Sequence, residues 1–158
     1  MSRRILYVIA SLRRGAASHL LYLLEHFLKA GYDLSLAAPQ DCSANELRLE
    51  RLPIRWVKTS AHRRFSSEAR NQVAEVLQQL EPDILHSHGI RAGYYARQAL
   101  ARVKKFGCKT RAVYTIHGYH PAYYPNPLLR SLAFQLEKRL FLTQTDHLIF
   151  VSRADQTV

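Results

Sequence analysis

Short apolar runs alternate along the chain with segments in which apolar residues recur at helical spacing. Runs rich in Ile, Val and Leu with little polar alternation are typical of strands that are covered on both faces of a sheet. On this basis we expect buried strands at residues 5–9, 33–38, 54–57, 83–87, 112–116 and 147–151.

Four of the intervening segments carry apolar residues three and four positions apart, which indicates amphipathic helices. The first ends at Gly31, the second at Pro82 and the third at Gly107, while the fourth begins at Pro127. Residues 43–51 are predicted to form a further short helix. The apolar positions are Ala17, Leu20, Leu21, Leu24 and Leu28; Ala69, Val73, Val76, Leu77 and Leu80; Ala92, Ala96, Ala99, Leu100 and Val103; and Leu129, Leu132, Ala133, Leu136 and Leu140.

The repeated order of strand and helix predicts an α/β fold. Parallel strands must be joined by crossover connections, and these are right-handed and usually helical. We therefore expect a doubly wound, Rossmann-like parallel sheet of about six strands with helices on both faces. In such a sheet, ligands bind beyond the carboxyl ends of the strands.

Composition and charge narrow the function classes. The chain has 158 residues, 47% of them hydrophobic, which suits one globular domain, and no apolar run is long enough to span a bilayer. The net charge of +11 attracts phosphate groups of nucleic acids, anionic lipids or small molecules. The arginines occur in pairs rather than long blocks, which argues against a disordered nucleic-acid arm. Two cysteines form neither a disulfide framework nor a zinc site, so we expect a cytoplasmic protein.

Candidate functional residues follow three of the predicted strands. Gly15 follows the first strand, in "ASLRRGAASHL", and opens a helix. It is a single glycine rather than GxGxxG, which argues against a nicotinamide dehydrogenase domain. The fourth strand runs into "HSHGIR", which contains His88, Gly89 and Arg91. The fifth runs into "HGY", which contains His117 and stands beside a flexible glycine.

The histidines at the fourth strand raise the question of a metal. Because side chains alternate along a strand, His86 and His88 lie on the same side. His117 can approach them in space, but no third ligand is spaced to complete a site, so we predict no metal. A structural role for His86, bonded to backbone, is as well supported as a functional one. Arg91 opposes the dipole at a helix start, which favours a partner anion.

With these residues assembled, the sequence resembles the N-terminal half of a GT-B fold glycosyltransferase of family 4, a retaining group. The resemblance extends over the whole chain in register. It is carried by "ILYVIASLRRGAASHLLYLLEHFLKAGYDLSLAAP", "LEPDILHSHGIRAGYYARQAL", "AVYTIHGYH" and "TDHLIFVSRAD".

The resemblance implies that residues 1–158 form the acceptor-side domain and that the C-terminal, donor-binding domain is absent. It places His117 near the transferred sugar, as the catalytic candidate, and Gly15 and Ala16 near the donor phosphate and sugar. This chain has Arg14-Gly15-Ala16 where the family often has two adjacent glycines. The acceptor side would be lined by His88, Gly89, Arg91, Gly118 and Tyr119. The resemblance also implies metal-independent chemistry without a cofactor.

The expected function is transfer of a sugar from a nucleotide-sugar donor to a glycan or lipid-linked acceptor, in polysaccharide biosynthesis. This half alone is expected to be inactive and to need the missing domain or a partner chain. Aromatic and basic residues at 119–141, including Tyr119, Tyr123, Tyr124, Phe134 and Phe141, suggest peripheral contact with the inner face of an anionic membrane. The alternatives are a non-catalytic partner subunit of a split transferase and a basic nucleotide- or nucleic-acid-binding module, although no nucleic-acid motif is present.

Overall fold

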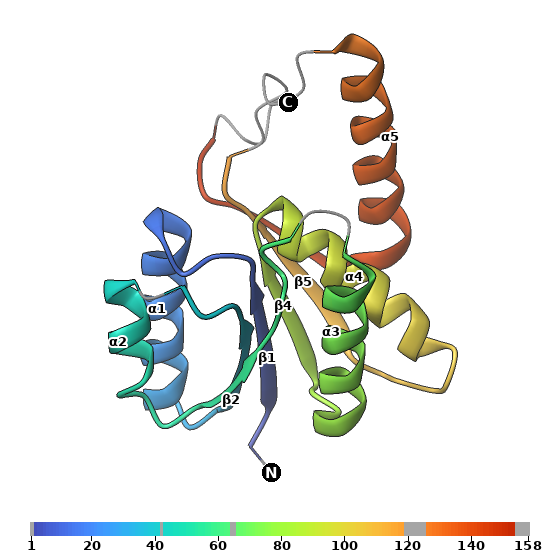
Figure 1. Cartoon of the computed structure of the whole chain (residues 1–158). Coiled ribbons are helices and arrows are strands. Elements are labelled where there is room, and N and C mark those ends of the chain that lie inside the picture. The colour runs from blue at the N-terminus through green and yellow to red at the C-terminus, as the bar shows by residue number, and fades with distance from the viewer. Residues whose placement is uncertain (1, 42, 64–65, 119–125, 154–158) are drawn as a thin grey trace.

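The structure is a computed structural model that describes residues 2–41, 43–63, 66–118 and 126–153 (Figure 1). Strands and helices alternate along the whole chain. They are β1 (Arg4–Ile9), α1 (Arg14–Lys29), β2 (Asp33–Ala38), α2 (Ala44–Leu49), β3 (Arg55–Lys58), α3 (Ser67–Leu80), β4 (Ile84–His88), α4 (Ile90–Lys104), β5 (Arg111–Ile116), α5 (Pro127–Gln144) and β6 (His147–Phe150).

The strands form one six-stranded sheet in the order β3-β2-β1-β4-β5-β6, and every pair is parallel. The order turns back at β1, so the first half of the chain builds one side of the sheet and the second half builds the other. This arrangement confirms the predicted doubly wound fold. The predicted strands agree with the observed ones to within one residue at each end, and the predicted short helix is α2.

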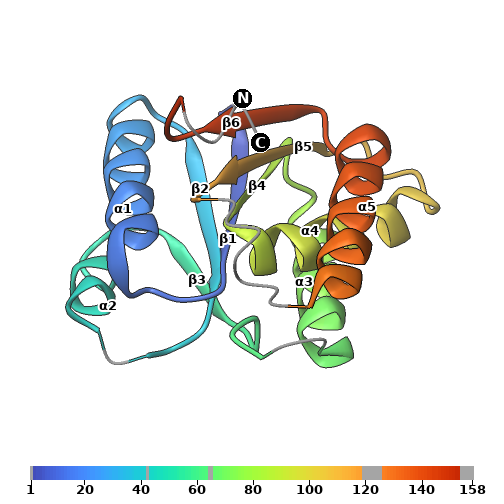
Figure 2. The same cartoon turned by 90° about the horizontal axis from the view of Figure 1, so that it is seen from above.

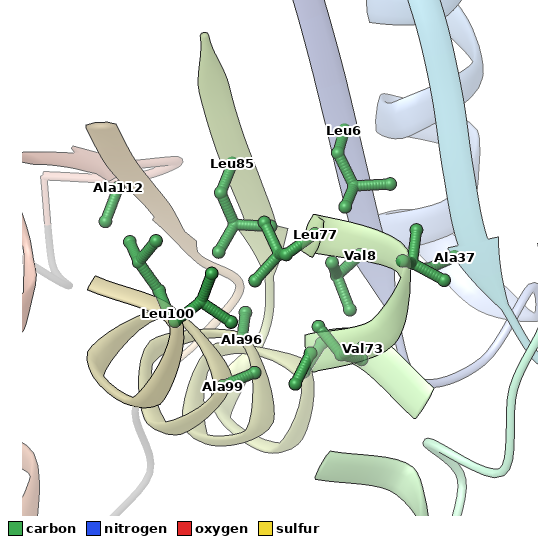
Figure 3. Close-up of a cluster of buried hydrophobic side chains, with 14 residues drawn as sticks. Leu6, Val8, Ala37, Val73, Leu77, Leu85, Ala96, Ala99, Leu100 and Ala112 are labelled. Carbon is green, nitrogen blue, oxygen red and sulfur yellow. The ribbon is translucent and has the colours of Figure 1, made fainter. Parts of the chain in front are cut away.

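Helices cover both faces of the sheet (Figure 2). On one face, α1 and α2 pack against a cluster that includes Tyr7, Leu20, Leu24 and Leu36. On the other face, α3 and α4 enclose a second cluster (Figure 3). Its labelled members are Leu6, Val8, Ala37, Val73, Leu77, Leu85, Ala96, Ala99, Leu100 and Ala112. The buried stripes predicted for the first three long helices are the faces that make these contacts.

Helix α4 packs closely on β5 because Gly93 has no side chain. A Cβ atom at Gly93 would lie 2.6 Å from the ring of Tyr114. Two turns of α4 around this glycine therefore approach the sheet more closely than any larger residue would permit. The same contact brings Arg97 over the Tyr114 ring, with 4.4 Å between the guanidinium carbon and the ring centroid.

Helix α5 is attached less extensively than the other long helices. Its first turns rise above the sheet in Figure 1, and its described buried residues are Glu137 and Leu140. Glu137 accepts a hydrogen bond of 2.8 Å from Arg97, and Phe141 stacks on Tyr114. Phe141 is thus a packing residue in part, and the membrane contact suggested for it stays a prediction. The exposed apolar residues of α5 are Leu128, Leu129, Leu132, Phe134, Leu136 and Leu142.

Among the helices of the described ranges, none is both long enough and apolar enough to cross a membrane.

Candidate functional site

The carboxyl ends of β1, β4 and β5 meet at one edge of the sheet. The register pairs Ile9 of β1 with His88 of β4, and His88 with Thr115 of β5. His117 follows Thr115 by two residues and therefore lies on the same face, just beyond the end of β5. The parallel register thus brings together two histidines that are 29 residues apart in the sequence.

Three histidines from different elements contact one another at this edge. His88 Nδ1 and His117 Nε2 lie 3.0 Å apart, within hydrogen-bonding distance. The ring of His19, from α1, is 5.8 Å from that of His88 and 5.3 Å from that of His117. One nitrogen from each of the three rings fits within a group whose members are all within 4.8 Å. We call His19, His88 and His117 the histidine cluster.

The cluster combines a buried histidine with two half-buried ones. His88 is only 2% exposed, whereas His19 and His117 are both partly accessible. Within the ranges that the structure describes, the buried atoms His88 Nε2 and His19 Nδ1 have no hydrogen-bond partner. A buried polar atom left without a partner costs free energy, so these two nitrogens are suited to accept a ligand.

Burial keeps the histidines of β4 neutral. Burial is the main reason that the pKa of His88 lies well below its ordinary value, and the neighbouring His86, His117 and His19 lower it further. The pKa of His86 falls to about 4, again mainly through burial and then through His19 and His117. At neutral pH both rings therefore have one N–H donor and one lone pair.

His86 has a separate, structural position. Its Nε2 atom lies 2.8 Å from Thr115 Oγ1, and its ring stacks between Tyr7 and His88 at centroid distances of 5.2 and 4.3 Å. Of the two roles considered from the sequence, the geometry matches packing and hydrogen bonding within the sheet. The partner is a side chain of β5 rather than the backbone.

Two helices begin without a side-chain cap at the edge of the sheet where the carboxyl ends of β1, β4 and β5 meet, which we call the functional edge. Helices α2, α3 and α5 are capped by Ser43, Ser66 and Asn126, respectively. In contrast, α1 follows Arg13 and α4 follows Gly89 with no side-chain cap and no acidic residue in the first turn. Their first N–H groups therefore remain available to an anion, and the positive end of each helix dipole favours one.

Gly89 connects the end of β4 to α4 in a conformation that favours glycine. Its φ is +78°, a region that side chains rarely adopt. The Gly89 amide donates to the carbonyl oxygen of Thr115 at 2.9 Å, and the Gly93 amide donates to the Gly89 carbonyl at 2.8 Å. This connection at Gly89 brings the first helical turn of α4 next to His88.

Gly15 and Ala16 lie in the first turn of α1, four and three residues before His19. A Cβ atom at Gly15 would meet no atom within 4 Å, so its surroundings in the described structure leave room for a side chain. Ala16 is half-buried against the cluster beneath α1. Both predicted residues are therefore on the same side of the sheet as the histidine cluster.

Asp41 holds the loop that leads into α1. Its Oδ2 atom accepts hydrogen bonds from the Leu12 amide at 2.8 Å and from Ser11 Oγ at 3.3 Å. Burial acts to raise the pKa of Asp41, but hydrogen bonds with Ser43, Leu12 and Ser11 and the charge of Arg13 together lower it below its ordinary value. This carboxylate therefore fixes the approach to Gly15 while it is ionised.

The other residues predicted for the acceptor side are Arg91, Gly118 and Tyr119, and they differ in their surroundings. Arg91 lies in the first turn of α4, is exposed and donates a hydrogen bond from Nη1 to the His62 carbonyl. That bond gives its guanidinium a partner within the protein. Gly118 directly follows His117 and has a φ of +80°. Tyr119, like Tyr123 and Tyr124, lies outside the described residues.

Sequence reasoning missed His19 as a member of the site. His19 lies next to the buried residue Leu20 and three residues after Ala16, so it borders the apolar stripe of α1 near the start of the helix. A polar residue at that position, in a helix that begins at the functional edge, is the signal that could have identified it. It is the third histidine that the spacing along the chain does not reveal.

The described cluster has the donor set of a transition-metal site. Three imidazoles with nitrogens within 4.8 Å suit ions such as Zn²⁺, which three histidines can hold with a fourth position open. The pair considered from the sequence, His86 and His88, is not this set, because His86 is engaged with Thr115. Imidazole rings could equally donate to or accept from a sugar hydroxyl.

Comparison with solved structures shows the same fold in three proteins. Anabaena Alr3699/HepE, solved in complex with UDP and glucose, matches with a TM-score of 0.70 and 20% identity over 97% of this chain and 39% of that one. Sucrose-phosphate synthase from Thermosynechococcus elongatus matches with a TM-score of 0.63 and 12% identity over 98% of this chain and 44% of that one. MurG from Acinetobacter baumannii matches with a TM-score of 0.60 and 13% identity over 96% of this chain and 41% of that one. This chain thus spans less than half the length of each.

At the level of sequence, no curated protein matches the chain significantly. The family Glycosyltransferase Family 4, however, matches residues 13–157, which include α1, the histidine cluster and β6. This match covers nearly all of the chain and agrees with the resemblance seen in the sequence. The chain belongs to Glycosyltransferase Family 4.

Proposed function

We propose that this chain forms the acceptor-side half of a retaining glycosyltransferase, which transfers a sugar from a nucleotide-sugar donor to a glycan or lipid-linked acceptor. The observation that carries the proposal is the hydrogen-bonded pair of His88, which burial keeps neutral, and His117, beside two helix N-termini that lack side-chain caps. Family membership and the solved UDP- and glucose-bound relative support the assignment of the donor class.

In the proposed mechanism, backbone amides stabilise the leaving group and histidines orient the sugar. Negative charge grows on the leaving diphosphate during glycosyl transfer, and the N–H groups at the start of α1 and α4 would stabilise it. His117, held by its hydrogen bond to His88, would orient a hydroxyl of the transferred sugar. His88, Gly89, Arg91, Gly118 and Tyr119 would line the acceptor side.

Retention would follow from attack on the same face as departure. The residues that follow β4 and β5 are His, Gly and Arg rather than a pair of carboxylates at glycosidase spacing. A double displacement through an acidic nucleophile therefore has no candidate at these strand ends. The hydrogen-bonding groups of this half can act without a metal, so we propose metal-independent transfer.

The donor would be held mainly by a second domain or a partner chain. The similar solved chains extend well beyond the region that this chain matches, since only 39–44% of each is covered. We propose that this additional part lies across from the carboxyl edge and supplies the contacts to the nucleotide. The 158-residue chain alone would then have little or no transferase activity.

We further propose that the enzyme contacts the inner face of an anionic membrane through α5. Leu129, Leu132 and Leu136 are 55%, 58% and 40% exposed and recur at helical spacing. Lys138 and Arg139 on the same helix are exposed and basic, and the whole chain has a net charge of +11. Apolar and basic groups on one helix are typical of interfacial membrane binding, and a lipid-linked acceptor would be found there.

The transferase proposal can be tested with a chimera. The chain would be joined to the part of Anabaena HepE that it does not match, and release of UDP from UDP-glucose would be measured. We expect turnover by the folded chimera, none by residues 1–158 alone, and a fall of about 100-fold or more in the His117→Ala chimera. His147→Ala, at the start of β6 and the opposite edge of the sheet, is the matched control and should be neutral.

Two outcomes would overturn this function. Turnover of a nucleotide sugar by the 158-residue chain alone would refute its role as half of a site. A folded, active chimera that is indifferent to His117→Ala would remove His117 from the chemistry and favour a non-catalytic partner subunit. Strong, salt-dependent binding of generic DNA, with no retention of a nucleotide sugar by the chimera, would favour the nucleic-acid-binding module.

A further inference from the structure

The histidine cluster joins three imidazoles on a rigid frame. His88 is the last residue of β4, His117 follows β5, and His19 comes from the second turn of α1. One nitrogen from each ring lies within 4.8 Å of the others. We propose that the histidine cluster binds a late first-row divalent cation of the Zn²⁺ type, with three imidazole ligands and an open fourth position.

The distances suit such an ion after small movements. Zinc lies about 2.0–2.1 Å from a histidine nitrogen, so two ligands in a tetrahedral site are about 3.3 Å apart. His88 Nδ1 and His117 Nε2 are already 3.0 Å apart and need to separate by only a few tenths of an ångström. The half-buried rings of His19 and His117 can rotate to close the wider gap, whereas the buried ring of His88 provides a fixed point.

The donor set selects the class of cation. Imidazole ligands suit Zn²⁺, Cu²⁺, Ni²⁺ and Co²⁺, whereas Mg²⁺ and Ca²⁺ prefer oxygen ligands. His86 is not a fourth ligand, because its Nε2 is bonded to Thr115 Oγ1. The fourth position would be taken by water or by another small ligand, as in other sites built from three histidines.

The buried nitrogens supply an independent reason to expect a ligand. Across the described ranges, His19 Nδ1 and His88 Nε2 are shielded from water and have no hydrogen-bond partner. Most buried polar side-chain atoms in proteins have a partner. A cation bound by His19 Nδ1 would remove the first of these deficits.

Metal binding would have a consequence for transfer, and this consequence alone rests on the proposed function. An ion held by His117 would occupy a ring nitrogen that now interacts with His88, so His117 could no longer present the same hydrogen bonds to a sugar. Transfer without metal and inhibition by Zn²⁺ are therefore compatible. The cluster would make the enzyme sensitive to free transition metals.

The binding test uses the 158-residue chain without a histidine tag. Zn²⁺ affinity would be measured by competition with a chromophoric chelator, and Co²⁺ would report geometry through its visible absorption. We expect one ion per chain, four-coordinate Co²⁺ spectra and an affinity at least about 100-fold weaker in His19→Asn and in His88→Asn. His26→Asn, also on α1 but exposed and outside the cluster, should bind like the unmodified chain.

The two His→Asn variants guard against a folding artefact. His19 is half-buried, so His19→Asn should keep the native circular dichroism spectrum even if His88→Asn does not. Absence of one-to-one binding at micromolar Zn²⁺ would overturn the proposal, as would an affinity lowered by His26→Asn but not by His19→Asn. Because binding is measured without a sugar donor, its failure would leave the transferase proposal untouched.

Discussion

The centre of the sheet and its β6 edge are built in different ways. In β1 every residue after Arg4 is buried, whereas no residue of β6 is fully buried. Helix α1 covers β1 with a leucine-rich face, whereas α5 buries Leu140 and a glutamate. The comparison teaches that apolar packing determines the position of the functional edge. The α5–β6 edge instead combines the buried Arg97–Glu137 ion pair with the stacking of Phe141 on Tyr114 and leaves apolar surface exposed.

The largest expected effect comes from breaking that ion pair. Glu137→Ala leaves the Arg97 guanidinium, only 1% exposed, without its carboxylate partner. Removing one member of a buried pair typically costs about 3–5 kcal/mol, so the free energy of unfolding in urea should fall by that amount.

The double variant Arg97→Leu with Glu137→Leu sharpens this test. Replacing both charges by apolar groups is often neutral or stabilising, so most of the lost stability should return. If Glu137→Ala costs less than about 1 kcal/mol, the Phe141–Tyr114 stacking and Leu140 would be sufficient to hold α5, and the contrast between the two regions would weaken.

Acid should destabilise the folded chain through the buried His86 at the centre of the sheet. The pKa of His86 is about 4 in the folded chain and near 6.5 when unfolded. Between these values the unfolded chain takes up a proton that the folded chain does not. The stability that depends on neutral His86 is thus fully present above about pH 6.5 and falls by about 3 kcal/mol as the pH approaches 4, and neutral His88 adds a loss of the same sign.

Urea unfolding at a series of pH values, with a chelator present, would measure this loss. His86→Asn should make the dependence between pH 6.5 and 4 less steep, because Asn has no proton to gain there and can still bond to Thr115. The remaining slope would come from His88, whose pKa is also lowered by burial. His26→Asn, exposed on α1, should keep the original slope. An equal slope in His86→Asn and the unmodified chain would contradict the assignment.

The smallest effect on stability is expected on the outer surface of α5. Replacing Leu129, Leu132 and Leu136 together by Ser should change the free energy of unfolding by only about 0.5 kcal/mol per site, because all three side chains are exposed. Flotation with anionic liposomes should nevertheless fall to background if α5 contacts the membrane.

A matched exposed residue provides the control. Tyr22, 65% exposed on α1, should be replaceable by Ser with no effect on flotation. If the triple variant floats as well as the unmodified chain, the exposed leucines would instead be the contact surface for the additional domain. A large loss of stability in the triple variant would show that α5 is packed more like the centre of the sheet.

Sequence patterns were sufficient for the fold because they report burial. A strand covered on both faces must be apolar at successive positions, and the runs at β1, β4 and β5 have this property. The position of His88 and His117 at one edge then follows from the parallel register. Gly15 and Arg91 were likewise placed correctly at helix starts.

The site itself could be predicted only in part, because its contacts depend on side-chain direction across elements. His19 enters from α1, and no spacing in the sequence relates it to His88 or His117. The partner of Arg91, the His62 carbonyl, is in a loop with no pattern of its own. The Arg97–Glu137 pair was missed for the same reason, since the two residues are 40 positions apart.

The missing side chain at Gly93 links the packing of the hydrophobic core to the geometry of the candidate site. Because its backbone rests on Tyr114, this glycine sets the height of the first turn of α4, and with it the Gly89 amide that donates to Thr115. One added methyl group would push that turn away from β5, the strand that leads to His117. In the proposed transferase, a substitution on the far side of the sheet would in this way lower activity without touching any substrate.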